Sequence, residues 1–255
     1  MIVEKVGNRG VLFTFDELNV EPYNCITNVF VIVGLKNFLV CDTYLGPYYV
    51  KKIKDYLRSN YGNKSYVVFN SHSHWDHVWG NSEFQSSKII AHESCKAIMH
   101  ETSVQDLKLL ESEFAKDVIE IVFPNLTFES ELKLEEENIL FFHSPGHSLD
   151  SSSCYDYVDK VLFVGDNIDD PIPSFMCWDN IVEYRETLKK YLSFDIEYLV
   201  QSHGSVMTSS VIESNIKYLD SLIENKSISF QDVTVEKKHK GNLAFLNRIH
   251  VNNSE

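Results

Sequence analysis

Residues 70–77 read Asn-Ser-His-Ser-His-Trp-Asp-His, and this stretch decides both the fold class and the chemistry to be expected. It directly follows a short apolar run, residues 66–69, which has the length and composition of a buried β-strand. Side chains two positions apart in an extended segment point the same way, so His72 and His74 are placed to hold one metal ion. The stretch therefore predicts a metal site just beyond the end of a strand.

The next two polar side chains of the same stretch predict a second metal ion. If the chain turns into a helix after His74, Asp76 and His77 point away from the first pair and are placed to hold another ion. Imidazole and carboxylate groups are preferred ligands of zinc, and they also suit iron and manganese. We therefore expect two divalent ions, with zinc as the first choice and iron or manganese as alternatives.

Three other apolar strand candidates also lead into a potential metal ligand. They are residues 139–142 before His147, residues 160–164 before Asp166, and residues 197–200 before His203. His147 comes after Pro145-Gly146, a tight turn that leaves room for an ion close to the backbone. Loops held by a rigid sheet position functional groups accurately, so we expect these side chains to join one metal centre. By contrast, His92 and His143 are interpreted as structural.

Strand-like and helix-like segments alternate along the chain, which favours an α/β fold with helices covering the sheets. The other expected strands are 11–15, 28–33, 37–41, 88–91, 126–128, 131–134 and 154–158. Helical periodicity is found at 48–58, at 92–114 as one or two helices, at 181–192 and at 209–224. Because no linker rich in Gly, Ser or Pro interrupts the chain, we predict one domain over residues 1–255, with a core of about 10–225 and a C-terminal extension, 226–255.

Composition and charge narrow the classes of partner. With 23 Lys and Arg against 37 Asp and Glu, the formal net charge is −14, which is unfavourable for binding nucleic acid. The basic run 237–240 is interpreted as a solvated surface segment. The longest apolar run, residues 29–33, is far too short to cross a bilayer, so no membrane partner is expected. A small-molecule substrate is the expected partner, and the oligomeric state stays open.

The N-terminus and the cysteines predict a cytoplasmic protein. The first residues lack the basic head, apolar core and small cleavage-site residues of a secretory signal. The five cysteines are an odd number without a Cys-x-x-Cys pair, namely Cys25, Cys41, Cys95, Cys154 and Cys177. We interpret them as reduced, buried thiols.

In this order and at these separations, the motifs His-Ser-His-Trp-Asp-His, Pro-Gly-His-Ser, Gly-Asp and Ser-His-Gly resemble the metallo-β-lactamase-fold hydrolase superfamily, which includes glyoxalase-II-like enzymes. The resemblance covers about residues 10–225. It implies a four-layer αβ/βα sandwich with the metal centre at one edge, between the two sheets. The ligands that it implies are His72, His74 and His147 for the first ion, Asp76, His77 and His203 for the second, and Asp166 as a bridge between them.

Two positions depart from the family pattern, and a third resembles it. Asp166 stands where lactam-hydrolysing members commonly carry Cys, and together with the missing export signal this weakens an antibiotic-hydrolase assignment. Trp79 stands where many members have Gly; Trp75 and Trp79 either wall the substrate pocket or belong to the core. Asp42 resembles a family carboxylate that orients the metal loops and fixes the tautomers of the ligand histidines.

The charge of such a centre predicts its chemistry. Two divalent ions supply a charge of +4, from which Asp76, Asp166 and a bridging hydroxide remove three. The remaining positive charge lowers the pKa of bound water from 15.7 to about 7 and attracts a polarised or anionic substrate. We therefore expect a dinuclear metal-dependent hydrolase that attacks an ester, thioester, lactone or phosphodiester with metal-bound hydroxide. Asp76, beside the nucleophile, is the expected catalytic residue that accepts its proton.

Several alternatives stay open on the sequence alone. A glyoxalase-II-like thioesterase is one candidate hydrolase, although its basic glutathione-binding tail has only a faint counterpart at residues 236–248. A mononuclear iron persulfide dioxygenase of the same fold retains the full motif. RNA-processing metallo-hydrolases also carry it, but the short chain and the charge of −14 disfavour them. A non-catalytic metal-binding scaffold is disfavoured because both predicted sites are complete.

Overall fold

The computed structural model describes residues 1–175 and 180–252, and within them the strands form two sheets. The first sheet contains, in spatial order, β1 (Ile2–Val6), β2 (Gly10–Phe15), β3 (Thr27–Val33), β4 (Asn37–Cys41), β5 (Ser65–Phe69), β6 (Lys88–His92) and β7 (Leu126–Phe128). The second contains, in spatial order, β12 (Tyr198–Val200), β11 (Val161–Phe163), β10 (Ser152–Asp156), β9 (Ile139–His143) and β8 (Glu131–Leu134). Pairing is antiparallel from β1 to β4 and from β8 to β11, whereas β4 to β7 and the pair β11–β12 are parallel.

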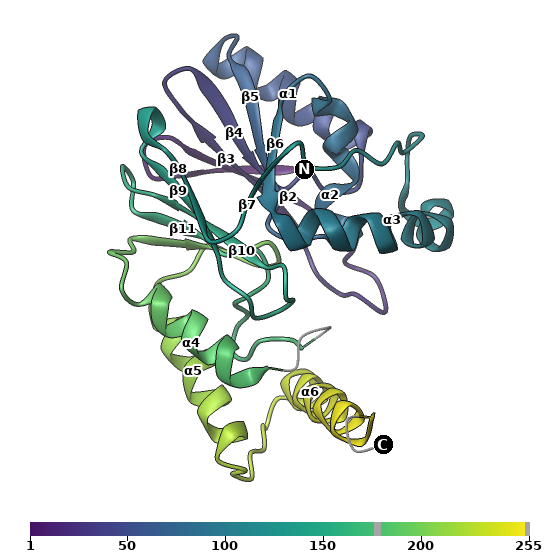
Figure 1. Cartoon of the computed structure of the whole chain (residues 1–255), viewed down its shortest axis with the longest axis vertical. Helices are drawn as coiled ribbons and strands as arrows, with labels where there is room; N and C mark the ends of the chain where they lie inside the picture. Colours follow the sequence, from purple (N-terminus) through teal and green to yellow (C-terminus); the bar gives the residue numbers. More distant parts are fainter. Residues whose placement is uncertain (176–179, 253–255) are drawn as a thin grey trace.

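Helices cover the outer faces of both sheets, which gives the predicted four-layer sandwich over the described part of the chain (Figure 1). The helical elements that follow strands of the first sheet are α1 (Pro47–Tyr61), α2 (Trp75–Val78), the 3-10 turn η1 (Trp79–Phe84) and α3 (Glu93–Phe114). Those that follow strands of the second sheet are α4 (Ile181–Tyr191) and α5 (Ser210–Ile223). The remaining two are the 3-10 turn η2 (Glu135–Glu137) between β8 and β9, and α6 (Val233–Asn252) after α5.

Alternation of side chains along the strands produces three apolar cores among the described residues. On β3, Val31 packs into the core beneath α1 and α3, whereas Phe30 and Ile32 pack between the two sheets. Between the sheets, the stacked rings of Phe69 and Phe141 lie 4.6 Å apart. The third core lies between the second sheet and helices α4 and α5. Close packing of this kind holds the two sheets in a fixed relation, so loops at their common edge are rigidly placed.

The candidate ligands lie on loops that leave the carboxyl ends of strands. Because β4–β5 and β11–β12 are parallel pairs, the carboxyl ends within each pair meet at one edge. The loops concerned carry Asp42 after β4, residues 70–77 after β5, His147 after β9, Asp166 after β11 and His203 after β12. Gly165 makes one close approach possible, because its φ is +59° and an added Cβ would lie 2.8 Å from the Ser71 hydroxyl oxygen.

Most of the predicted strands and α-helices are confirmed with small shifts at their ends, and one strand and one α-helix were missed. Residues 93–114 form one helix, α3, rather than two. The missed elements are β1, an edge strand paired only to β2 among the described strands, and α6. The interpretation of residues 237–240 as a solvated segment is wrong at two positions, because His239 is 4% exposed and Lys238 forms an ion pair with Asp169.

The cysteine prediction is confirmed in part. Cys41, Cys95 and Cys154 are buried free thiols and Cys25 is a half-buried one, whereas Cys177 lies outside the described residues. Burial raises the pKa of the Cys41 and Cys95 thiols well above the usual value, so both stay protonated and unreactive. Over the described ranges, no helix has the length and apolar character needed to cross a membrane.

Candidate metal centre

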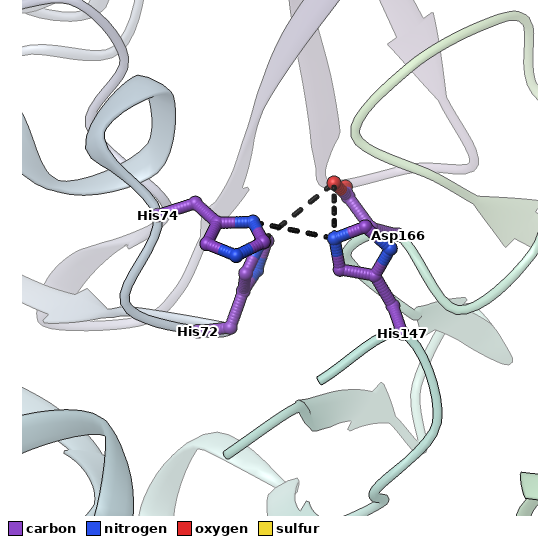
Figure 2. Close-up of side chains that lie close together, drawn as sticks. All are labelled: His72, His74, His147 and Asp166. Atoms are coloured by element: carbon purple, nitrogen blue, oxygen red, sulfur yellow. Dashed lines mark hydrogen bonds and ion pairs between the residues drawn. The ribbon is translucent and has the colours of Figure 1, made fainter. Parts of the chain in front are cut away.

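Three imidazoles and one carboxylate converge at the edge between the sheets (Figure 2). The Nδ1 atom of His74 lies 3.0 Å from Nε2 of His72 and 3.2 Å from Nε2 of His147. The Oδ2 atom of Asp166 lies 3.7 Å from each of these two Nε2 atoms. The four predicted groups are thus within reach of one ion, although they come from loops of different sheets.

The second predicted set converges beside the first and shares the same carboxylate. Oδ2 of Asp76 lies 3.3 Å from Nε2 of His77 and 3.3 Å from Nε2 of His203. Oδ2 of Asp166 lies 3.4 Å from Nε2 of His77 and 3.3 Å from Nε2 of His203. Asp166 therefore stands between both sets, in the place expected of a bridge. All seven candidate residues are brought together, while their role as ligands stays a prediction.

Burial and neighbouring charges set the protonation states of two imidazoles and both carboxylates of the centre. Burial lowers the pKa of the His72 imidazole well below its usual value and that of His147 to about 4, so both rings are neutral at pH 7. Burial alone raises the pKa of Asp76 and of Asp166, but the imidazoles around them outweigh it and hold both values well below the usual range. Neutral imidazoles and ionised carboxylates are the forms that bind metal ions.

The second set stabilises positive charge. Burial alone lowers the pKa of His77 and His203, but the carboxylates of Asp76 and Asp166 outweigh it and raise both values well above normal. The pocket thus favours cations, whether they are protons on these rings or metal ions between the donors. A divalent ion satisfies the same carboxylates and leaves the imidazole lone pairs as ligands.

The donor set fits divalent transition metals in its chemistry and its spacing. Donor atoms around a tetrahedral zinc ion lie about 3.3 Å apart, which matches the separations of 3.0–3.7 Å in both sets. Oδ1 of Asp166 is buried and has no hydrogen-bond partner among the described residues. Buried polar atoms are normally paired, so this oxygen marks a place where a ligand belongs.

The Asp42 carboxylate accepts hydrogen bonds from loops of both sheets next to the centre. Its Oδ1 accepts from the Ser71 N–H at 2.8 Å, and its Oδ2 accepts from the Ser71 hydroxyl at 2.8 Å. The same Oδ2 accepts from Nδ1–H of His77 at 2.9 Å and from the Ser202 hydroxyl at 3.3 Å. Because the proton of His77 is held on Nδ1, its Nε2 presents a lone pair to the centre. This is the orienting contact that the sequence predicts for Asp42.

Other histidines of the centre are oriented by backbone carbonyls. Nδ1–H of His203 donates to the carbonyl oxygen of Ile26 at 3.0 Å, and Nδ1–H of His147 donates to that of Ser174 at 3.3 Å. In both rings Nε2 is then the atom left for an ion. The tautomers thus follow from contacts that these rings make on their outer sides.

Sequence reasoning missed two buried polar side chains that fix these loops. The amide oxygen of Asn167 accepts from the His147 N–H at 2.8 Å, and its amide nitrogen donates to the carbonyl oxygen of Ser144 at 2.6 Å. Oδ2 of Asp150 accepts from the Ser73 N–H at 2.7 Å, within the His-Ser-His stretch. Asn167 directly follows Asp166 at a strand end, and that position is the signal that was available for it.

The structure also shows where the two tryptophans and three further histidines lie relative to the core and the donor sets. Trp79 is 1% exposed and belongs to the core, and the half-buried Trp75 packs against the same core. His92 and His143 lie outside both donor sets and stack on each other, with ring centroids 3.8 Å apart. This agrees with the structural interpretation of both rings. His100 stacks on Phe123 and also lies outside both sets.

Comparison with known proteins decides the family. The profile described as Metallo-beta-lactamase superfamily matches residues 23–203, which include all seven candidate ligands. The chain belongs to the metallo-β-lactamase superfamily. No curated protein matches the chain. Membership of this superfamily and the two donor sets together support a metal-dependent hydrolase.

Solved metallo-β-lactamases share the fold of this superfamily member at low sequence identity. The metallo-β-lactamase from Pontibacter korlensis superposes with a TM-score of 0.67 at 15% identity, covering 86% of this chain and 98% of its own. TMB-1 gives a TM-score of 0.70 at 17% identity, with coverage of 88% and 98%. The enzyme from Hirschia baltica gives 0.68 at 16% identity, with coverage of 86% and 96%. At these identities the likeness establishes the fold.

Proposed function

We propose that the chain holds two divalent metal ions, zinc by preference, and hydrolyses a small-molecule ester, thioester, lactone or phosphodiester in the cytoplasm. The observation that carries the proposal is the position of Asp166, whose Oδ2 lies 3.7 Å from the first set of imidazoles and 3.3–3.4 Å from the second. One carboxylate oxygen between two complete donor sets favours a dinuclear centre over a single ion.

Divalent ions, when bound, supply a water molecule that ionises near neutral pH and a Lewis acid for the carbonyl or phosphoryl group. The chain's own side chains would hold the ions and orient the water, and one of them would accept the proton that the water loses. Asp76 is the candidate catalytic residue, because its carboxylate is ionised, 9% exposed and in contact with both His77 and His203. Its Oδ2 is placed to accept a proton from an attacking water and to pass it to a leaving group.

The open side of the centre lies near His203, whose side chain is 23% exposed, whereas His72 is 1% exposed. Aromatic rings gather around Trp75, the residue before Asp76, with Tyr23 and Trp75 5.7 Å apart and Trp75 and Phe114 5.1 Å apart between centroids. Burial, then the carboxylates of Glu113 and Asp76, raise the pKa of the Tyr23 phenol, so this ring lies within electrostatic reach of the centre. We infer that the rings of Tyr23 and Trp75, which are more exposed than Phe114, contact an apolar part of the substrate next to its scissile group.

The test is elemental analysis of the purified protein, followed by assays on ester, thioester, lactone and phosphodiester substrates. We expect two ions per chain, hydrolysis of at least one class, and in D76N the loss of hydrolysis together with weaker binding of the second-set ion, while the first-set ion is retained. H72A should lose metal and hydrolysis together. H100A, which removes a histidine outside both donor sets, is the matched control and should behave as wild type.

Three results would contradict the proposal. Full hydrolysis by a preparation stripped of metal would exclude metal-dependent catalysis. One iron per chain with oxygen uptake on a persulfide substrate would favour the dioxygenase instead. Metal binding without turnover on the whole panel would favour a metal-binding scaffold.

A further inference from the structure

The segment from Asp166 to Ser174 runs from a candidate ligand to the carbonyl that orients His147, and α6 contacts this segment. Asn242, on α6, is 3% exposed. Its amide nitrogen donates to the carbonyl oxygen of Pro173 at 2.8 Å, and its amide oxygen accepts from the N–H of Phe175 at 3.0 Å. One side chain therefore clamps the backbone on both sides of Ser174.

Ser174 is the residue whose carbonyl oxygen accepts from Nδ1–H of His147 at 3.3 Å. On the other side of that ring, Nε2 of His147 lies 3.2 Å from Nδ1 of His74 in the first donor set. A continuous series of contacts thus leads from Asn242 through the clamped backbone to a candidate ligand. If the backbone around Ser174 shifts, the acceptor that keeps the proton on Nδ1 shifts with it.

Asn242 is itself held in place by a contact with α5. Its amide nitrogen also donates to the hydroxyl of Tyr218 at 3.0 Å, and that hydroxyl bonds to Nδ1 of the buried His239 at 2.9 Å. One turn before Asn242, Lys238 pairs with Asp169 within the same segment. Figure 1 shows α6 as the last helix of the chain, well away in sequence from every candidate ligand.

We propose that Asn242 is a positioning residue for the metal centre, and that α6 sets the affinity of the first donor set through it. The inference rests on the proposed function, because it requires that the first set binds an ion. Loss of the amide leaves the carbonyl of Pro173 and the N–H of Phe175 without their partner in a buried place, and the segment then moves to satisfy them. The ring of His147 loses its fixed orientation as a result.

The experiment compares metal binding by the full chain and its N242A and N242D variants. N242D keeps an acceptor for the Phe175 N–H and loses the donor to Pro173. The matched control is N125A, because Asn125 clamps the backbone in the same way, accepting from Ile89 N–H at 3.0 Å and donating to the Ser87 carbonyl at 2.9 Å. The probes are Co²⁺, followed by its visible ligand-field absorption, and Zn²⁺, measured by competition with a chelator.

We expect N242A to bind the first-set ion about tenfold more weakly and to give an altered cobalt spectrum, as outer contacts of a metal ligand do. N242D should fall between wild type and N242A, and N125A should bind as wild type does. Wild-type affinity and spectrum in a folded N242A would overturn the inference. So would unfolding of both Asn242 variants, since it would assign α6 to the core as a whole. Failure of the wild type itself to bind either metal would instead refute the proposed function.

Discussion

Replacing Asp42 with Asn isolates the contribution of one buried charge to the metal centre. Asp42 has a φ of +63°, a backbone conformation that Asn tolerates well, so D42N adds little backbone strain. The side chain keeps its shape, but one acceptor oxygen becomes an NH₂ donor. Either orientation of the amide then sets the NH₂ group against a donor, which is the Ser71 N–H in one case and His77 Nδ1–H in the other.

The structure sets the size of the expected effect. One charge-assisted hydrogen bond is lost in a buried place, which costs about 1.5–3 kcal/mol of the free energy of unfolding. If the NH₂ group faces His77, the ring must move its proton to Nε2, and the lone pair is withdrawn from the second set. We expect the affinity for the second-set ion to fall by about 10- to 100-fold, or about 1.4–2.7 kcal/mol.

The assay is a Zn²⁺ titration in competition with a chelator, together with urea unfolding of the same preparations. The control is D159N, because Asp159 is 5% exposed and its Oδ2 accepts from the backbone N–H groups of Asn8 and Arg9 at 2.8 and 2.7 Å. D159N should lose similar stability and keep the affinity of the wild type. Equal losses of affinity in both variants would refute the argument, since the effect would then come from general destabilisation.

Three further predictions follow from single features of the structure. G165A should lower the free energy of unfolding by about 1–2 kcal/mol in urea, because alanine is strained at a φ of +59° and its Cβ meets Ser71; unchanged stability would contradict this. Removal of metal by a chelator should lower the melting temperature by about 5–10 °C, measured by circular dichroism and reversed by added Zn²⁺. Burial and then the charge of His143 lower the pKa of His92 below its ordinary 6.5. As the pH falls, the His92 ring is therefore protonated in the unfolded state before it is protonated in the folded state. The free energy of unfolding should accordingly decrease as the pH drops below about 6.5. H92Q should show a smaller fall in stability between pH 7.5 and pH 5.5.

The sequence predicts the centre well because its ligands follow a local rule. Each candidate ligand lies within a few residues of an apolar strand's end, and the strand runs are short and clearly bounded. The strands are aligned by the apolar cores, and the ligand loops are then carried to one edge. The pairing of Asp166 with both donor sets needs the fold, because it depends on how the two sheets face each other.

The contribution of α6 could not be predicted, for a physical reason. The side of this helix that packs against the protein includes His239 and Asn242, which are 4% and 3% exposed. Polar residues on a buried face hide the apolar periodicity that marks an amphipathic helix. Their partners, the Tyr218 hydroxyl and the backbone around Ser174, are distant in sequence. Only the folded chain brings donors and acceptors together.

The two sheets contribute different parts of the centre, and this links metal binding to the packing between them. The loop after β5 in the first sheet supplies His72, His74, Asp76 and His77, whereas loops of the second sheet supply His147, Asp166 and His203. Ions held between these donors connect the sheets, as the bond from Ser202 to Asp42 already does at 3.3 Å. Because ions bind only where both halves are correctly spaced, their binding free energy adds to the stability of the whole sandwich. A substitution that changes the spacing between the sheets should therefore weaken metal binding even when every donor is intact.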